Sequence, residues 1–416
     1  MSTTETNRAI EAVWKIESAR LIGGLTRIVR DVGVAEELAQ DALVAALEQW
    51  PDSGVPENPG AWLMAAAKHR AIDRLRRNQM LDRKHEELGR VYQILEQTVP
   101  DLPSILDDPV QDDLLRLIFI ACHPVLPREG RVALTLRVLG GLTTMEIARA
   151  FLLPEPTIAQ RIVRAKRTLS EAGVPFEIPP GPELGTRLAS VLEVIYLIFN
   201  EGYSATLGDD WMRPELCSEA LRLGRILAEL KPGEPEAHGL LALMEIQASR
   251  ARARVGPKGE AVLLLQQDRT RWDQLSIRRG LDALQRAQRL GTEAGPYRLQ
   301  AEIAACHARA MRAEDTEWHK IASFYDELAT AMPSPVVELN RAVAHGMAFG
   351  PAAGLAMVDA LIASQALENY HLLPAVRGDL LEKLGRLDEA RAEFKRAADM
   401  TRNAKERELL LQRISG

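Results

Sequence analysis

The chain has 416 residues, of which 46% are hydrophobic and only 5% aromatic, and its formal net charge at pH 7 is −6. This length is too great for one ordinary core and predicts two to four domains, while the abundance of Ala, Leu and Arg favours an all-α fold. The acidic balance gives no sign of nucleic-acid binding by the chain as a whole, although a local basic surface remains compatible with it.

The first 80 residues show helical periodicity. Apolar residues recur at helical spacing over residues 10–30 and 35–50, and residues 31–33 form a turn between these two segments. The stretch PDSGVPENP at 51–59 is predicted to be a loop from its Pro, Gly, Asp and Asn content. Asn58 and Pro59 then begin a third helix, which is expected to run to about residue 81.

This third helix is predicted to have two different faces. Its apolar stripe consists of Trp62, Leu63, Ala66, Ile72 and Leu75. Arginine presents forked donors that suit phosphates and base edges, so the opposite face is a candidate DNA-binding surface, although a merely solvated basic face is the alternative for this helix alone. The residues of this basic face are Lys68, His69, Arg70, Arg74, Arg76 and Arg77.

A Pro-containing acidic linker is predicted at 88–110, and a second helical group follows over 112–172. Within this group, residues 142–169 have the form of a helix-turn-helix. Thr143 or Thr144 can cap the first helix, residues 152–155 form the turn, and Pro156 suits the first turn of the second helix. Ile158, Ile162 and Leu169 are expected to pack inward.

The outward face of that second helix is the stronger DNA-binding candidate. Between Arg149 and Arg167 the chain carries five Lys or Arg and one Glu, so this segment is basic in an acidic protein. A recognition helix needs long polar side chains that reach base edges and basic side chains that hold phosphates. An ordinary helical hairpin is the alternative. The outward residues are Thr157, Gln160, Arg161, Arg164, Lys166 and Arg167.

A Pro- and Gly-rich cluster at 175–182 is predicted to be the main domain boundary, and helices joined by short turns follow it. The last helix pair matches the tetratricopeptide pattern at Leu380, Leu384, Gly385, Ala390, Phe394 and Ala397. A weaker copy surrounds Gly346. The 39-residue spacing between the two glycines makes the repeats irregular, so a compact all-helical domain is the alternative.

Catalytic and metal chemistry finds little support in the sequence. The polar residues 200–203, 267–269 and 272–273 could converge for acid–base work, but ion pairs and helix caps explain them more simply. No phosphate-loop, zinc-protease or nucleophile-elbow motif occurs, and Cys122, Cys217 and Cys306 form no metal-ligand spacing. We therefore expect no enzymatic activity, no cofactor and no metal. No apolar run approaches the ~20 residues that cross a bilayer, so a cytoplasmic protein is expected.

Several stretches together resemble the extracytoplasmic-function group of sigma-70-type RNA polymerase sigma factors. AEELAQDAL at 35–43 resembles that group's segment for binding core polymerase. NPGAWL at 58–63 and RAIDRLRR at 70–77 resemble its −10 segment. LPREGR at 126–131, GLTTMEIA at 141–148 and TIAQRIVRAKRTL at 157–169 resemble its −35 domain.

This resemblance implies a region and a role for each part of the chain. Residues 8–82 would form sigma region 2, 83–111 a linker and 112–175 region 4, followed by a helical extension at 183–312 and tetratricopeptide-like repeats at 313–416. Glu37, Gln40 and Asp41 would bind core polymerase. The 51–59 loop and the helix around His69 would hold a flipped −10 base. The family often has Asn where this chain has His69, and the loop has no aromatic residue.

The extension resembles that of one sigma subgroup at FNEGY 199–203, GLLALM 239–244, QDRTRWD 267–273, GPYRLQA 295–301 and PSPVVELNRAV 333–343. The implied partners are core RNA polymerase, promoter DNA and a protein or peptide bound by the extension, which would regulate activity. The alternative is a helix-turn-helix activator with a repeat-based sensor. The basic helix after Pro59 argues against this alternative, because an activator has no use for it.

Overall fold

The computed structural model describes residues 3–85, 110–204, 212–256, 260 and 262–415. Within these ranges the regular structure consists of eighteen α-helices and four short 3₁₀ helices, without a strand, which confirms the all-α prediction. The chain divides into an N-terminal unit, Met1–Val194, and a C-terminal unit, Ile195–Gly416. None of the described helices is both long and apolar enough to cross a membrane.

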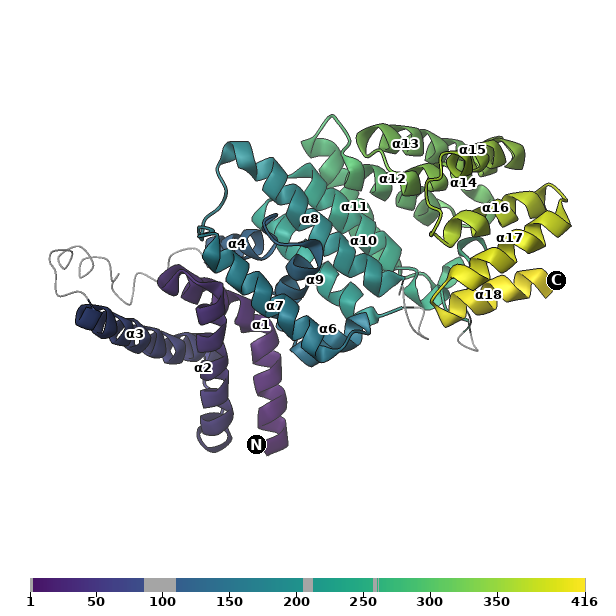
Figure 1. Cartoon of the computed structure of the whole chain (residues 1–416). Helices are drawn as coiled ribbons and strands as arrows, with labels where there is room; N and C mark the ends of the chain where they lie inside the picture. Colours follow the sequence, from purple (N-terminus) through teal and green to yellow (C-terminus); the bar gives the residue numbers. More distant parts are fainter. Residues whose placement is uncertain (1–2, 86–109, 205–211, 257–259, 261, 416) are drawn as a thin grey trace. The chain divides into compact units, whose positions relative to one another are not determined.

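Three helices open the N-terminal unit: α1 (Thr3–Val29), α2 (Val32–Ser53) and α3 (Pro59–His85) (Figure 1). Their boundaries follow from local capping. Asp31 accepts a hydrogen bond of 2.9 Å from the Val34 N–H, and the Asn58 side chain accepts one of 3.0 Å from the Ala61 N–H. Both caps satisfy backbone donors that a helix start leaves free.

Two details of this group differ from the sequence prediction. Helix α2 continues through Pro51 to Ser53, so the loop is shorter than 51–59, and Gly54 with φ 82° ends the helix. The buried stripe of α3 is Leu63, Ala67 and Ala71, spaced four residues apart, whereas Ile72 is 36% exposed. The inward face of α3 is thus narrower than predicted, because small alanines permit a close approach to α1 and α2. Leu75 lies outside the described side chains.

The next four helices contain the predicted helix-turn-helix: α4 (Val110–Ala121), α5 (Arg128–Val138), α6 (Thr144–Phe151) and α7 (Glu155–Glu171). Thr143 caps α6 in a capping box. Its hydroxyl accepts a 3.1 Å hydrogen bond from the Glu146 N–H, and its own N–H donates to Glu146 Oε2 at 2.8 Å. Leu152, with φ 50°, ends α6, and Pro156 lies in the first turn of α7 as predicted.

Helix α8 (Gly181–Tyr203) begins at the end of the Pro-rich cluster, and its first half packs within the N-terminal unit. The Ser190 hydroxyl donates to the Cys122 carbonyl at 2.6 Å, and Arg187 donates to the Phe119 carbonyl at 2.9 Å. Leu188 and Val191 are buried beside them. The compact units therefore divide inside α8, after Val194, and not at the 175–182 cluster. The predicted 83–111 linker falls mostly outside the described residues.

The C-terminal unit holds the remaining helices. They are α9 (Pro214–Leu230), α10 (Pro235–Ala248), α11 (Gln274–Leu290), α12 (Pro296–Arg309), α13 (Trp318–Ala331), α14 (Pro335–Phe349), α15 (Pro351–Ala363), α16 (Leu372–Lys383), α17 (Leu387–Met400) and α18 (Ala404–Ser415). Four 3₁₀ turns lie between them: η1 (Ala251–Ala253), η2 (Leu264–Gln266), η3 (Arg269–Arg271) and η4 (Ala313–Asp315). Successive helices pack as neighbours, as the repeat pattern predicts.

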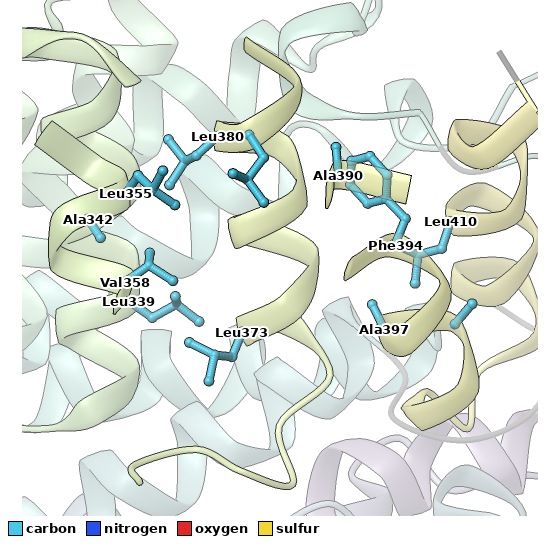
Figure 2. Close-up of a cluster of buried hydrophobic side chains, with 12 residues drawn as sticks. Leu339, Ala342, Leu355, Val358, Leu373, Leu380, Ala390, Phe394, Ala397 and Leu410 are labelled. Atoms are coloured by element: carbon cyan, nitrogen blue, oxygen red, sulfur yellow. The ribbon is translucent and has the colours of Figure 1, made fainter. Parts of the chain in front are cut away.

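Figure 2 shows the core at the end of these repeats. Of the predicted pattern residues, Leu380, Ala390, Phe394 and Ala397 share one buried cluster, whereas Leu384 is 38% exposed. A Cβ atom at Gly378 would lie 2.8 Å from the Phe394 ring, which explains the small residue facing a bulky one. In the preceding pair, a Cβ at Gly354 would lie 2.6 Å from the Ala342 carbonyl oxygen, so α14 and α15 meet at small residues.

Candidate nucleic-acid interface

The second helix of the helix-turn-helix, α7, has a clean division between packing and exposed residues. Ile158, Ile162, Ala165 and Leu169 are buried. Gln160 and Arg164 are exposed, and Thr157 and Arg161 are half-buried. Three arginines of α7 line a groove with Pro127, Glu129 and Gly130 at the start of α5; they are Arg161, Arg164 and Arg167. The α7 side of the groove thus carries these three arginines and one carboxylate, that of Glu171.

The α7 arginines differ in their partners. Neither Arg161 nor Arg164 makes an ion pair or side-chain hydrogen bond anywhere in the part of the chain that the structure describes. Arg167 instead donates to Glu171 at 2.6 Å, one turn further along α7, with both side chains largely exposed. Such an exposed pair contributes little to stability and breaks easily. All three guanidinium groups are therefore available to a polyanion.

Lys166, predicted to face outward, lies elsewhere. It forms an ion pair with Glu36 of α2, whose side chain is only 4% exposed. Glu36 also accepts hydrogen bonds from Arg137 Nε at 2.6 Å and from Gln40 Nε2 at 2.5 Å. A polar cluster of the buried Glu36 with the half-buried Gln40, Arg137 and Lys166, here called the Glu36 cluster, thus joins α2, α5 and α7. It contains one residue from each of two predicted surfaces, Gln40 and Lys166.

A second contact joins the same helical groups. Helix α4 packs along α1, where Arg27 Nε lies 3.3 Å from Asp113 and a Cβ at Gly23 would lie 3.1 Å from the Asp113 carbonyl oxygen. Glu36, Arg137 and Asp113 are functional candidates that the sequence reasoning missed. The signal for Glu36 was present, because it occupies the inward face of α2 with Val32, Ala35 and Ala39. A charge on a buried face requires a buried partner.

The basic face of α3 is only partly exposed. His69 and Arg74 are exposed, while Lys68 and Arg70 are half-buried. Burial, reinforced by the nearby positive charge of Arg27, lowers the pKa of Lys68. Arg74 pairs with Glu37 at 2.9 Å, with both side chains about half exposed (46% and 63%). Arg76 and Arg77 lie outside the described side chains.

The other predicted polymerase-binding residue, Asp41, is exposed on α2 beside this surface. At the far end of α2, Trp50 packs edge-to-face on Trp62 with ring centroids 5.3 Å apart. This aromatic pair fixes both ends of the 54–58 loop next to the first turn of α3. No group of three or more His, Cys, Asp or Glu among the described residues could hold a metal ion.

Three family models match consecutive parts of the chain. Residues 17–80 match sigma-70 region 2, and residues 116–169 match sigma-70 region 4. These matches cover α1–α3 and α4–α7, the two helical groups that the Glu36 cluster joins. Residues 187–288 match a family of unknown function, DUF6596, which covers the beginning of the extension.

Curated relatives are similar to either the whole chain or part of it. An uncharacterized protein of Rhizobium meliloti (strain 1021) is 44% identical over 386 residues, 92% of this chain and 90% of the relative. The ECF RNA polymerase sigma factor SigK of Mycolicibacterium vanbaalenii is 28% identical over 165 residues, 39% of this chain and 80% of SigK.

Among solved structures, a tetratricopeptide repeat protein from Parabacteroides merdae aligns with a TM-score of 0.35 at 15% identity, over 66% of this chain and 98% of that protein. The sigma-region matches fall within the two N-terminal helical groups, and the relative from Rhizobium meliloti aligns with 92% of the chain and so with most of the extension as well. The chain therefore contains regions 2 and 4 of the sigma-70-type RNA polymerase sigma factors and is similar to extracytoplasmic-function sigma factors, and a helical extension that matches DUF6596 at its beginning follows these regions.

Proposed function

We propose that this protein binds core RNA polymerase and directs it to promoters that carry particular −35 and −10 elements. The observation that supports this most is that one chain contains two basic helices: α7 of the helix-turn-helix, whose Arg161 and Arg164 have no partner among the described residues, and α3. The −35 duplex would be bound through its major groove by α7, and α3 would hold the −10 segment.

Each surface residue then has a proposed role. Gln160, Arg161 and Arg164 would contact base edges at −35, while Thr157 and Arg167 would hold the backbone. At −10, His69 would border the pocket for a flipped base. Glu37 and Asp41 would dock on polymerase. The −10 backbone contacts would come from Lys68, Arg70, Arg74, Arg76 and Arg77. Gln40 and Lys166 would become available only once the Glu36 cluster opens.

The proposed sequence of events needs no chemical step in the protein. Docking on polymerase would come first, duplex capture at −35 next, and strand separation at −10 last. The free energy for separating the DNA strands would come from the protein binding open DNA more tightly than the closed duplex. A ligand shifts such an equilibrium only by the difference between its affinities for the two states. Side chains of α3 that contact only unpaired bases would supply this difference.

Reconstitution tests the proposal. The full-length protein would be added to core polymerase free of other sigma factors, with sheared genomic DNA of the source organism as template, and transcript 5′ ends would be sequenced. We expect start sites that share upstream elements at −35 and −10. If the protein binds DNA but starts transcription only when another sigma factor is present, it is a helix-turn-helix activator and the proposal is wrong.

We also propose that the extension regulates this activity, by itself or through a protein or peptide partner. The start of α8 supports a physical link to region 4. Glu193 accepts hydrogen bonds from Arg128 at 2.5 Å and from Arg131 at 3.1 Å, and Arg131 also donates to Ser190 at 2.5 Å. Arg131 is 13% exposed on its side chain, so this contact is largely shielded from water.

Truncation after Pro182 is therefore expected to lower the thermal stability of the N-terminal unit. It removes the buried Leu188 and Val191 and leaves Arg131 without its partners, a loss of several kcal/mol. Truncation after Tyr203, which keeps α8, is the matched control and should preserve that stability. Circular dichroism melting measures both. Equal melting of the two truncated chains would contradict the packing argument.

The same two truncated chains distinguish a regulatory role of the extension from a purely structural role of α8. If the chain ending at Tyr203 initiates transcription as the full-length protein does under every condition tested, the extension beyond α8 has no regulatory role. A change in activity without a change in melting would support regulation by the repeats.

A further inference from the structure

Three arginines gather around two aromatic rings in the C-terminal unit. The Arg254 guanidinium carbon lies 3.7 Å from the centre of the Tyr203 ring, and that of Arg269 lies 5.0 Å from the Trp272 ring. Arg250 lies between the rings, 5.7 Å from Tyr203 and 5.8 Å from Trp272. The fold thus brings the separated polar segments around Tyr203 and Arg269 together at the η1 turn.

Two of these arginines have partners that offset their charge. Arg269 donates to the His307 and Ala310 carbonyls, both at 2.7 Å, at the negative end of the α12 dipole. Arg254 donates to the Tyr203 carbonyl at 2.7 Å. Burial alone would raise the pKa of Glu406, but hydrogen bonds from His371 and Thr401 and the charge of Arg254 lower it. Arg254 therefore lies near a carboxylate.

Arg250 has no such partner. It is 8% exposed, its Nε is buried, and its guanidinium makes neither a hydrogen bond nor an ion pair with any described residue. Two ring nitrogens nearby also lack partners: Nε1 of Trp272, 3% exposed, and Nδ1 of His307, 7% exposed. Nε of Arg269 is the fourth buried nitrogen without one.

This arrangement is costly for the unliganded protein. Among the described residues, Nε of Arg250 finds no hydrogen-bond partner and no carboxylate pairs with the guanidinium, so only the ring faces of Tyr203 and Trp272 offset the loss of its hydration. Burial, together with the charges of Arg250 and Arg269, lowers the pKa of His307 to about 3, so this residue is neutral at pH 7 and adds no further charge. A trapped water molecule could accept hydrogen bonds from these nitrogens, but it would not neutralise the guanidinium.

We propose that Arg250 anchors a binding site for a small oxyanion, such as the carboxylate or phosphate group of a metabolite. Arginine binds planar oxyanions through paired hydrogen bonds. The Trp272 N–H and Arg269 Nε are the additional donors, and the faces of Tyr203 and Trp272 flank the guanidinium. The proposal does not depend on the sigma activity.

Thermal melting of the full-length protein tests this site directly. Inorganic phosphate and acetate would be titrated separately at constant ionic strength, with chloride replaced. We expect a saturable rise in melting temperature with at least one anion, because a ligand that binds only the folded chain stabilises it. The two titrations distinguish a phosphate site from a carboxylate site.

Arg250→Met should abolish this rise and should melt at or above the wild-type temperature without anion, because an apolar side chain of similar length replaces an uncompensated charge. Arg252→Met is the matched control, since Arg252 is exposed on the same turn, and it should keep the response.

Three results would overturn the proposal: no saturable rise with either anion, an equal loss of response in Arg252→Met, or Arg250→Met melting well below wild type, which would make Arg250 a structural residue. Should Arg250→Met fail to fold, Arg250→Lys with phosphorus NMR line broadening of phosphate replaces it; unchanged broadening would equally overturn the proposal.

Discussion

Replacement of Arg161 or Arg164 by alanine is expected to weaken binding to a −35 duplex by about 5-fold to 150-fold each, which corresponds to the range of about 1–3 kcal/mol for a good arginine–base contact. Both side chains start without any partner in the described chain, so the DNA contact replaces no internal interaction. For the same reason, neither substitution should change the melting temperature, because it leaves no buried group unpaired.

Arg167 and Arg20 provide the comparison for this prediction. Arg167→Ala should reduce affinity about equally for all sequences and lower the salt dependence by about one counter-ion, because Arg167 is assigned to phosphate. Arg20 is exposed on α1, so Arg20→Ala should leave the affinity for DNA unchanged. Fluorescence anisotropy against matched and scrambled duplexes at several salt concentrations measures all four variants. Unchanged affinity in both Arg161→Ala and Arg164→Ala would show that the recognition face is wrongly assigned.

The helix-turn-helix could be predicted from the sequence because its signals are local. The Thr143 cap, the prolines at the start of α7 and the spacing of Ile158 and Ile162 all lie within about thirty residues, and each determines a boundary or a face by itself. The tetratricopeptide core around Phe394 was predictable for the same reason, since two adjacent helices contain its pattern.

The rest could not be predicted because it depends on residues that meet only in the folded chain. Lys166 has the spacing of an outward residue, yet Glu36, 130 positions earlier, turns it toward α2. Arg250 lies in a run of small and basic residues typical of an exposed turn, and only Tyr203 and Trp272 bury it. Spacing identifies faces, but it does not identify which distant side chain covers them.

The Glu36 cluster has a consequence for promoter binding. A globular unit of about 194 residues is roughly 40 Å across. Elements centred near −35 and −10 are about 25 base pairs apart, or about 85 Å at 3.4 Å per base pair of B-DNA. The compact unit is therefore too small to occupy both elements at once. If the protein occupies both elements as proposed, regions 2 and 4 must separate, and the α1–α4 contact and the Glu36 cluster must break.

Glu36→Gln is expected to favour this separation strongly. The substitution leaves Arg137 and Lys166 against a neutral amide, and removing one partner of a buried ion pair costs about 3 kcal/mol or more. The open population should rise about a hundredfold, since each 1.4 kcal/mol is a factor of ten. Without polymerase, the variant should bind a −35 duplex more tightly, because Lys166 no longer has a competing partner.

Energy transfer between dyes on Ser53→Cys and Ser170→Cys, both exposed, measures the opening. The natural cysteines Cys122, Cys217 and Cys306 are all buried, so the dyes attach selectively to the introduced thiols. Glu37→Gln is the matched control, because its carboxylate pairs only with the half-exposed Arg74, and it should leave transfer unchanged. Identical transfer in Glu36→Gln and wild type would mean that the Glu36 cluster does not hold regions 2 and 4 together, and the α1–α4 contact would then be the one that polymerase must break.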